Sequence, residues 1–316
     1  MKHRILQVGR LLPELEACLA ADFDLHRLAD QSDPEAFLQS CGAGFVGLVT
    51  AAGGVGAPAW LLAALPSLRV ISSFGVGLDK IDLSVARERG IAVGHTPDVL
   101  NDCVADAAFA LMLDVGRRVS EADRFVRSGR WATEGNQGFG LGRKISGARL
   151  GIVGLGRIGQ AIARRAAGFD MPVRYHSRRR VEGVSWQHEP DLPALARWAD
   201  FLLISTSGGP ATQHLVNAAV LEALGPEGYL VNVSRGSVVD EQALLQALLA
   251  RRIAGAGLDV FEHEPQVPPE LRQLDHVVLL PHMASATRQT RAAMAQRVLD
   301  NLVGFLDRGQ LVSSAF

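Results

Sequence analysis

The sequence predicts an α/β protein built from two parallel-sheet domains, and three observations lead to this prediction. Short apolar runs alternate with segments of helical periodicity along the chain, which is the order typical of parallel sheets. A chain of 316 residues is long enough for two domains. A glycine-rich segment at residues 154–159 stands between an apolar run and a helical stretch, so a second α/β series begins in the middle of the chain.

The part of the chain before the glycine-rich segment is predicted to form a complete, smaller α/β unit. Its candidate strands are 4–8, 45–50, 69–72 and 91–93, and the helical stretches between them include 58–65 and 83–89. Residues 98–118 then show apolar positions at helical spacing. This long helix would carry the chain from one domain to the other.

The segment Gly154-Leu155-Gly156-Arg157-Ile158-Gly159 has the order strand, glycine turn and helix. It follows the apolar run 148–153 and opens the helical stretch 160–169. In such a turn the first glycine allows a tight bend, the second lets the backbone approach a pyrophosphate, and the third lets the helix pack closely on the strand. Free N–H groups at the helix start then face the phosphates. The pattern predicts a dinucleotide site, although an ordinary strand–helix turn without a ligand has the same local sequence.

The elements after this turn complete a second domain. Its further candidate strands are 171–176, 201–204, 229–233, 257–260 and 277–280, and a last helix spans about 286–306. This order favours a Rossmann-like nucleotide domain at residues 99–284. That domain is inserted into a split, flavodoxin-like substrate domain made of residues 1–98 and 285–316.

Composition and charge narrow the classes of partner. The formal net charge is −1, so no overall field favours nucleic acid or an anionic membrane. Cys18, Cys41 and Cys103 form no CxxC pair, which indicates reduced thiols in a reducing compartment. No apolar run approaches the roughly 18 residues of a membrane span, and the N-terminal apolar run is too short for a secretory signal. We therefore expect a cytoplasmic protein with no nucleic-acid partner, no membrane partner and no metal.

The end of the strand at 171–176 indicates which dinucleotide binds. A site for NAD(H) usually places Asp or Glu there, roughly 20 residues past the glycines, on the ribose 2′-hydroxyl. This chain instead reads Ser177-Arg178-Arg179-Arg180. A hydroxyl and guanidinium groups suit a 2′-phosphate, which arginine can bind with paired hydrogen bonds. The sequence predicts a preference for NADP(H), with NAD(H) left open as a second cofactor; the alternative is that the arginines form a solvated loop.

Three polar residues follow strands of the second domain, where ligands bind in open α/β sheets. They are Arg235, Glu264 and His282. Each also has a purely structural interpretation: Arg235 as the cap of a helix or strand end, Glu264 as a solvated loop carboxylate, and His282 as a buried histidine that donates to backbone. Together, after a dinucleotide motif, they supply the groups that hydride transfer to a ketone needs.

The set of motifs resembles that of the D-isomer-specific 2-hydroxyacid dehydrogenases. Besides the glycine turn, the matching segments are Val233-Ser234-Arg235-Gly236, residues 257–261 with Glu264-Pro265, and Pro281-His282. Residues 75–82 are similar to the carboxylate-binding loop of the family. The resemblance covers nearly the whole chain and keeps the motif order. Residues 98–106, Ser177-Arg178 and residues 205–210 look most like the NADPH-dependent glyoxylate, hydroxypyruvate and hydroxyphenylpyruvate reductases.

The resemblance implies an enzyme that reduces small 2-keto acids to D-2-hydroxy acids, and it assigns the catalytic roles. His282 would protonate the carbonyl oxygen during hydride transfer, and Glu264 would pair with it and help it to hold a proton near neutral pH. Arg235 would bind the substrate carboxylate and polarise the ketone as a fixed bidentate cation. His263, although it neighbours Glu264, does not match the motif.

The resemblance also implies contacts with cofactor and substrate. Asp259 would bind the nicotinamide carboxamide, and backbone N–H groups of Val76 and Gly77 would hold the substrate carboxylate. The small side chains of residues 51–55 resemble a pocket-lining loop in which Gly53 and Gly54 would border the substrate. Further cofactor contacts would come from Ser205, Thr206, Val233 and Ser234, besides Gly154 to Gly159 and Ser177 to Arg179.

The resemblance leaves the substrate, the reaction direction and the assembly open. Glyoxylate, hydroxypyruvate, hydroxyphenylpyruvate and a sugar-derived 2-keto acid all remain candidates. Trp131 lies on the segment that forms a dimer arm in relatives, so a homodimer is expected, with Trp131 either packed in the interface or reaching a neighbouring pocket. Two alternatives to a reductase are NAD-dependent oxidation of D-2-hydroxy acids and a nucleotide-sensing binding protein on the same fold.

Overall fold

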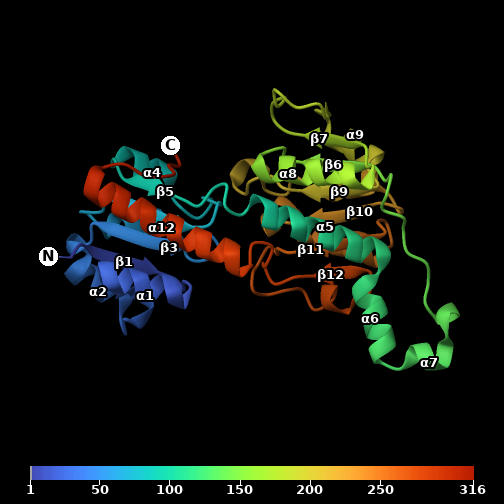
Figure 1. Cartoon of the computed structure of the whole chain (residues 1–316), viewed down its shortest axis with the longest axis horizontal. Helices are drawn as coiled ribbons and strands as arrows, with labels where there is room; N and C mark the ends of the chain where they lie inside the picture. The colour runs from blue at the N-terminus through green and yellow to red at the C-terminus, as the bar shows by residue number, and fades with distance from the viewer. Residues whose placement is uncertain (1) are drawn as a thin grey trace. The chain divides into compact units, whose positions relative to one another are not determined.

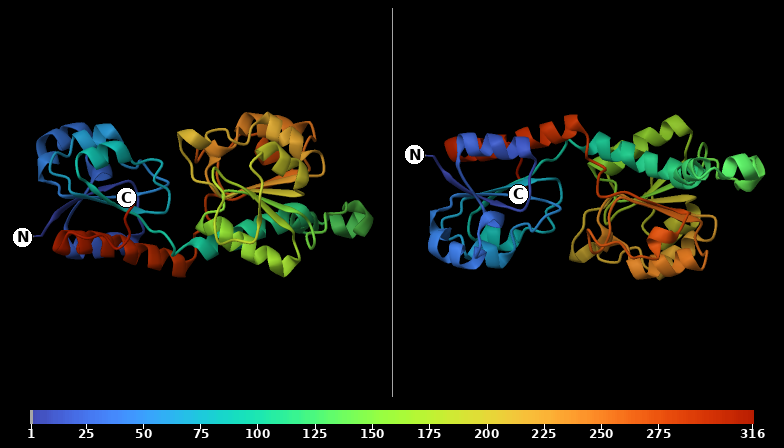
Figure 2. Two further views of the ribbon diagram at one scale, coloured as in Figure 1. Left: turned by 90° about the horizontal axis from the view of Figure 1, so that it is seen from above. Right: turned by 90° about the horizontal axis from the view of Figure 1, so that it is seen from below.

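The computed structural model describes residues 2–316 and consists of two compact units. The first unit runs to Leu100 and resumes at Thr287, and the second unit spans Asn101–Ala286. Each unit contains one sheet whose strands are all parallel, and the elements of each are labelled in Figure 1. Figure 2 shows helices on both faces of each sheet. The α/β class, with one parallel-sheet unit inserted into another, is confirmed.

The first unit has a five-stranded sheet in the order β2-β1-β3-β4-β5, which is the flavodoxin-like order. Its strands are β1 (Arg4–Val8), β2 (Asp24–Arg27), β3 (Gly47–Ala51), β4 (Val70–Phe74) and β5 (Ala92–Gly94). Its helices are α1 (Pro13–Asp22), α2 (Pro34–Cys41), α3 (Ala59–Ala63), α4 (Leu83–Glu88) and α12 (Arg288–Arg308). Leu48 and Ile71 are fully buried in the core that the sheet shares with α2, α3 and α4. The long helix α12 packs against β4, where Ser72 Oγ donates to the Val298 carbonyl at 3.1 Å.

The second unit has a seven-stranded sheet in the order β12-β11-β10-β9-β6-β7-β8, in which β6 lies between β7 and β9, as in a dinucleotide-binding sheet. Its strands are β6 (Leu150–Val153), β7 (Val173–His176), β8 (Gln187–His188), β9 (Phe201–Ile204), β10 (Tyr229–Asn232), β11 (Gly255–Leu258) and β12 (Val277–Leu279). Its helices are α5 (Asn101–Arg117), α6 (Val119–Arg127), α7 (Arg130–Glu134), α8 (Arg157–Ala166), α9 (Leu192–Trp198), α10 (Ala218–Leu224) and α11 (Glu241–Leu249).

Two sets of helices cover the second sheet. Helices α5 and α8 pack against each other, and α5 also contacts β10 and β11. Leucines of α9, α10 and α11 form a separate buried cluster with Leu202 and Leu230 of the sheet. Both faces of the sheet are therefore apolar, which explains the nearly continuous apolar runs of its strands. Among the described residues, no helix has the length and apolar character to cross a membrane.

The differences from the sequence prediction lie at element ends and at sheet edges. Strands β1 and β9 have the predicted bounds. The helix predicted at 98–118 is shorter, because Asp98 and Arg118 adopt left-handed φ angles of 70° and 59° at its two ends. The strand predicted at 257–260 begins two residues earlier, at Gly255, which carries no apolar signal. The edge strands β2 and β8 were missed because their residues are polar and partly exposed.

Candidate active site

The glycine turn of the second unit has the geometry that a dinucleotide site needs. Gly154 follows β6 with a φ of +94°, and a Cβ there would lie 2.6 Å from the Cα of Thr206. A Cβ on Gly159 would lie 2.1 Å from the Gly154 carbonyl oxygen, so α8 packs directly on the bend. At Gly156 no heavy atom lies within 4 Å of the Cβ position, which leaves the backbone open to an approaching phosphate. These residues fit a pyrophosphate at the start of α8.

The turn stands at the point where the strand order of the sheet reverses, and ligands bind at the carboxyl ends of strands there. Ser205 directly follows β9 and donates from Oγ to the Gly154 carbonyl at 2.7 Å. Thr206 packs on the same glycine. Val233 and Ser234 are buried directly after β10. The glycine turn and these four residues therefore follow three neighbouring strands, β6, β9 and β10.

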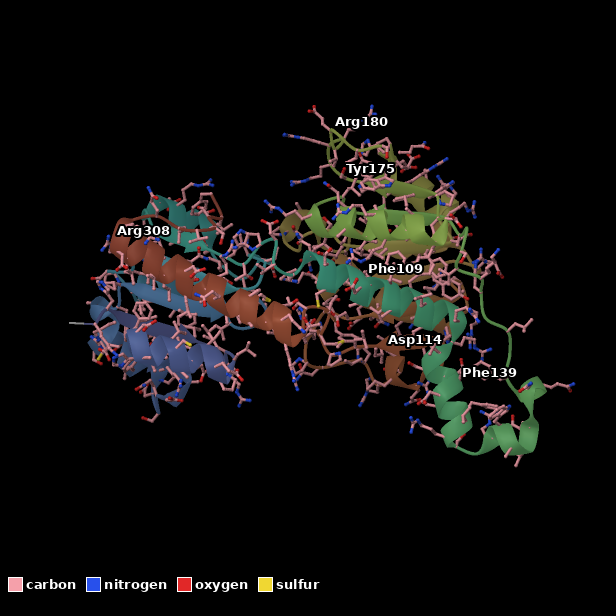
Figure 3. The ribbon with its side chains drawn as sticks, viewed as in Figure 1. Phe109, Asp114, Phe139, Tyr175, Arg180 and Arg308 are labelled. Atoms are coloured by element: carbon pink, nitrogen blue, oxygen red, sulfur yellow. The ribbon has the colours of Figure 1, made fainter. Side chains whose placement is uncertain are left out.

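The loop after β7 carries the predicted 2′-phosphate site. The arginines of residues 178–180 are exposed, and Ser177 Oγ donates to the Arg179 carbonyl at 2.6 Å. The loop folds back over the strand, where a backbone N–H donates to the hydroxyl of the buried Tyr175 at 2.9 Å. Figure 3 shows Tyr175 and, farther out on this loop, Arg180. Residues 177–181, at the end of β7, thus present cations and no carboxylate, which fits a phosphate better than a ribose hydroxyl.

Arg235 follows β10 and is confined by close backbone packing. Its Nη1 donates to the Ser234 carbonyl at 2.8 Å. A Cβ on Gly208 would lie 2.6 Å from the Cγ of Arg235, and a Cβ on Gly236 would lie 1.9 Å from the carbonyl carbon of Phe261. Gly208 thus leaves room for the Arg235 side chain, and Gly236 lets the backbone next to Arg235 approach the segment after β11.

The Glu264 and His282 side chains are paired. His282 Nδ1 lies 2.8 Å from Glu264 Oε2, and the other carboxylate oxygen accepts the N–H of Phe261 at 3.0 Å. Burial alone would raise the pKa of Glu264, but the hydrogen bond and charge of His282, with the charge of Arg235, outweigh burial and leave the pKa below its ordinary value. Because a carboxylate only accepts, Nδ1 carries the shared proton and Nε2 is left for chemistry.

Asp259 supports the backbone turn that carries His282. Its side chain is buried, and its two oxygens accept the N–H groups of Met283 and Ala284 at 2.7 and 3.0 Å. Its carbonyl accepts the N–H of His282 at 2.8 Å, and His282 has a φ of +51°, uncommon for a residue with a side chain. Burial raises the pKa of Asp259 in spite of the two N–H bonds. The contact of Asp259 with the nicotinamide carboxamide stays a prediction.

A second histidine–carboxylate pair braces the loop of Glu264 and was missed by the sequence analysis. His214 Nε2 lies 2.7 Å from Glu262 Oε1, and this hydrogen bond raises the pKa of His214. The N–H of Glu262 donates to Glu241 Oε2 at 3.1 Å. The two members of the pair are 48 residues apart in the chain, so no local pattern could have joined them.

The predicted substrate loops adjoin each other in the first unit, at the carboxyl ends of β3 and β4. The Ala52 N–H donates to the Phe74 carbonyl at 3.1 Å, and the Ala57 N–H donates to the Lys80 carbonyl at 2.9 Å. These bonds join loop 52–57 to loop 75–80 at both ends. The two loops carry the predicted substrate contacts Gly53, Gly54, Val76 and Gly77.

The three predicted catalytic residues follow neighbouring strands of one sheet. Arg235 comes after β10, Glu264 after β11 and His282 after β12. A histidine paired with a carboxylate can protonate a carbonyl oxygen, and a guanidinium can bind a carboxylate. Within residues 2–316, no group of three or more His, Cys, Asp or Glu side chains is placed to hold a metal ion.

The matching family model, the related sequences and the similar solved structures agree with one another. Residues 109–284 match the family model described as D-isomer specific 2-hydroxyacid dehydrogenase, NAD binding domain. The chain is 43% identical over 304 residues to a 2-ketogluconate reductase of Gluconobacter oxydans, covering 96% of each, and 49% identical over 247 residues to a hydroxyphenylpyruvate reductase of Plectranthus scutellarioides, covering 78% of each. The crystal structure of an NADPH-dependent glyoxylate/hydroxypyruvate reductase from Sinorhizobium meliloti, in complex with NADP and malonate, has a TM-score of 0.93 and 42% identity, covering 100% of this chain and 97% of that one.

Replacing Gly159 with alanine is expected to lower the free energy of unfolding by about 1–3 kcal/mol, because the new Cβ meets a backbone oxygen that cannot move aside easily. The matched change Gly168→Ala, just after α8, adds a methyl group where no heavy atom lies within 4 Å. That variant should stay within about 0.5 kcal/mol of the unmodified chain. Urea unfolding followed by circular dichroism measures both, and equal stabilities of the two variants would contradict the packing of α8 on the glycine turn.

Proposed function

The chain belongs to the D-isomer-specific 2-hydroxyacid dehydrogenase family and is an NAD(P)-dependent enzyme, and on this premise we propose that it reduces small 2-keto acids to D-2-hydroxy acids with NADPH. The observation that carries the proposal is the Glu264–His282 pair, 2.8 Å apart, on the sheet that also holds Arg235 and the glycine turn. The names of the relatives favour glyoxylate, hydroxypyruvate and hydroxyphenylpyruvate as substrates, with 2-ketogluconate as a sugar-derived candidate.

The proposed reaction needs a proton at the carbonyl oxygen and groups that hold the carboxylate. When bound, NADPH supplies the hydride. His282 donates the proton from Nε2, because Nδ1 is committed to Glu264. Arg235 binds the carboxylate and polarises the ketone, so that the negative charge developing on oxygen meets a fixed cation. The N–H groups of Val76 and Gly77 bind the carboxylate as well.

The preference for NADPH rests on the loop after β7. Residues 154–159 would hold the pyrophosphate, and Ser177, Arg178 and Arg179 would hold the 2′-phosphate. Ser205, Thr206, Val233, Ser234 and Asp259 would contact the rest of the cofactor. The absence of any acidic residue at positions 177–181 supports this choice, since NAD(H) sites usually place a carboxylate there.

We extend the proposal to a homodimer formed through the arm of residues 119–142. Val119, Val126, Trp131 and Leu141 of this arm are exposed, the last by 98%. Figure 1 shows α6 and α7 projecting away from the seven-stranded sheet. An apolar surface of this kind on a projecting arm is typical of a protein–protein contact. The arm has its own small aromatic cluster, in which the rings of Phe125 and Phe139 are 5.4 Å apart.

Initial rates of NADPH and NADH consumption test the proposal directly. The two cofactors are compared side by side with glyoxylate, hydroxypyruvate, hydroxyphenylpyruvate and 2-ketogluconate. Faster loss of NADPH than of NADH with at least one acid is the expected result. A preference for NADH would overturn the cofactor assignment. No turnover with either cofactor, in a protein that binds NADPH, would overturn the reductase assignment and favour the nucleotide-sensing alternative.

Removing the His282 ring is expected to lower kcat for keto acid reduction by about 10²–10⁴-fold, because the carbonyl oxygen then lacks its proton donor. NADPH binding, followed by the fluorescence of the cofactor, should persist in His282→Ala. His263→Ala removes an exposed histidine of a nearby loop and serves as the matched control, with near-normal turnover. Near-normal turnover of His282→Ala would remove His282 from the acid role.

Glu264→Gln is expected to move the high-pH limb of the reduction rate to lower pH. The depressed pKa of Glu264 keeps it ionised across the neutral range, where its charge favours protonated His282. Without that charge the pair holds the donated proton less tightly, so the proton donor is lost at a lower pH. The pH profile of kcat/KM measures the shift. Glu262→Gln, which neutralises the carboxylate paired with His214, should leave the limb in place.

Arg178→Ala is expected to raise the KM for NADPH about tenfold and to leave the KM for NADH nearly unchanged, since only NADPH carries the 2′-phosphate. Arg180→Ala changes the outermost arginine of the same run and is the matched control. Steady-state kinetics with both cofactors distinguish the two variants. An unchanged NADPH KM in Arg178→Ala would show that the arginine run is a solvated loop.

A further inference from the structure

Two backbone N–H groups of the first unit point to a ligand rather than to the protein. Within residues 2–316, neither the N–H of Val76 nor that of Gly77 has a hydrogen-bond acceptor. Both are partly exposed and follow β4 through Gly75, which has a φ of +144° and approaches the Ala52 side chain so closely that a Cβ would lie 2.4 Å away. Neighbouring N–H groups with no internal acceptor are suited to bind an anion.

The direction of each N–H is fixed by the carbonyl that precedes it. A trans peptide is planar, and its C=O and N–H point to opposite sides. The Val76 N–H shares a plane with the Gly75 carbonyl, and the Gly77 N–H shares a plane with the Val76 carbonyl. A hydrogen bond that holds either carbonyl therefore also aims the N–H on the far side of the same plane.

Both carbonyls are held by the two residues that follow β5. The Gly75 carbonyl accepts the Thr96 N–H at 2.9 Å, and the Val76 carbonyl lies 3.2 Å from the Nδ1 of His95. Since a carbonyl only accepts, Nδ1 is the donor in this contact. Thr96 also accepts the Gly75 N–H on its Oγ1 at 3.1 Å. His95 and Thr96 thus contact three backbone groups of the loop: the N–H and the carbonyl of Gly75 and the carbonyl of Val76.

A third peptide plane extends this arrangement to helix α12. The carbonyl of His95 accepts Asn301 Nδ2 at 3.1 Å and Ser313 Oγ at 2.6 Å, and it shares its plane with the Thr96 N–H. Asn301 is fully buried, and its Oδ1 accepts the Ser313 N–H at 2.9 Å. A Cβ on Gly94 would lie 2.8 Å from the Asn301 amide, so β5 and α12 are in direct contact there.

We propose that His95, Thr96 and Asn301 are positioning residues for the substrate carboxylate: through three linked peptide planes they aim the N–H groups of Val76 and Gly77. This inference rests on the proposed function, because the ligand of the two N–H groups is the carboxylate of the 2-keto acid. The His95 ring holds the Val76 carbonyl and so orients the Gly77 N–H. Asn301 holds the His95 carbonyl, which shares its peptide plane with the Thr96 N–H. That N–H in turn holds the Gly75 carbonyl and so orients the Val76 N–H. None of the three side chains touches the substrate.

The test compares His95→Ala and Asn301→Ala with Ser72→Ala as the matched control. Ser72→Ala also removes a buried hydrogen bond of the first unit, the one to α12, but leaves the three peptide planes alone. The carboxylate is held in the ground state and the transition state alike, so KM for the keto acid should rise about 3- to 10-fold with little change in kcat. The inhibition constant of oxalate, a carboxylate that cannot be reduced, should rise by a similar factor, whereas the NADPH KM should not move.

A rescue variant and a stability measurement distinguish a positioning role from a general loss of structure. His95→Asn keeps a side-chain N–H near the Val76 carbonyl and should recover most of the affinity. Ser72→Ala should lower the melting temperature without raising the keto acid KM. A keto acid KM and oxalate constant within twofold of the unmodified chain in both His95→Ala and Asn301→Ala would overturn the inference, as would a parallel rise in the NADPH KM.

The failure of this inference can be told apart from failure of the proposed function. If the unmodified chain reduces keto acids and the variants do so equally well, the positioning role alone is wrong. If the unmodified chain shows no turnover, oxalate binding by calorimetry decides: weaker binding in His95→Ala supports the positioning role, and equal binding overturns it. If the unmodified chain also fails to bind oxalate, the carboxylate site and the proposed function are both overturned.

Discussion

Close backbone packing at the carboxyl edge of the seven-stranded sheet is the constraint on which the candidate active site depends. Gly154 lies against Thr206, Gly208 against Arg235, and Gly236 against Phe261, with Cβ positions 2.6, 2.6 and 1.9 Å from the nearest atoms. A side chain at Gly154 or Gly236 would push neighbouring loops apart, and one at Gly208 would displace the Arg235 side chain. The pyrophosphate turn and the guanidinium are therefore placed by the same property, the absence of side chains where chain segments meet.

The sequence could predict the parts of the site that local chemistry requires. The three glycines of 154–159 are needed by one bend, and polar residues just after apolar strands mark the carboxyl edge of a parallel sheet. The contacts that connect distant loops have no such signal. His95 and Val76 are 19 residues apart, and Asn301 meets His95 across 206 residues. These contacts depend on which strands are neighbours in the sheet, so they could be identified only once the strand order was known.

Two carboxylates at this edge have different environments, and their pKa values and structural roles differ accordingly. Asp259 is 1% exposed and bonded to two backbone N–H groups, and its burial raises its pKa. The side chain of Glu264 is 30% exposed and paired with a histidine that leaves its pKa lowered. The first holds the shape of the turn that carries His282, and the second sets the charge beside that ring. A single carboxylate could not do both, because the turn requires burial and the charge requires partial exposure.

The groups proposed to contact the substrate carboxylate are one guanidinium and two backbone N–H groups. Arginine stays charged throughout the neutral pH range, and the N–H groups of Val76 and Gly77 are neutral and permanent donors. Substrate affinity should then vary little with pH, while proton transfer depends on the Glu264–His282 pair alone. In the proposed reaction, recognition therefore uses groups fixed by backbone geometry, and acid catalysis uses the Glu264–His282 pair. A change in pH can slow the reaction without releasing the substrate, which is the behaviour expected when binding and proton donation use separate groups.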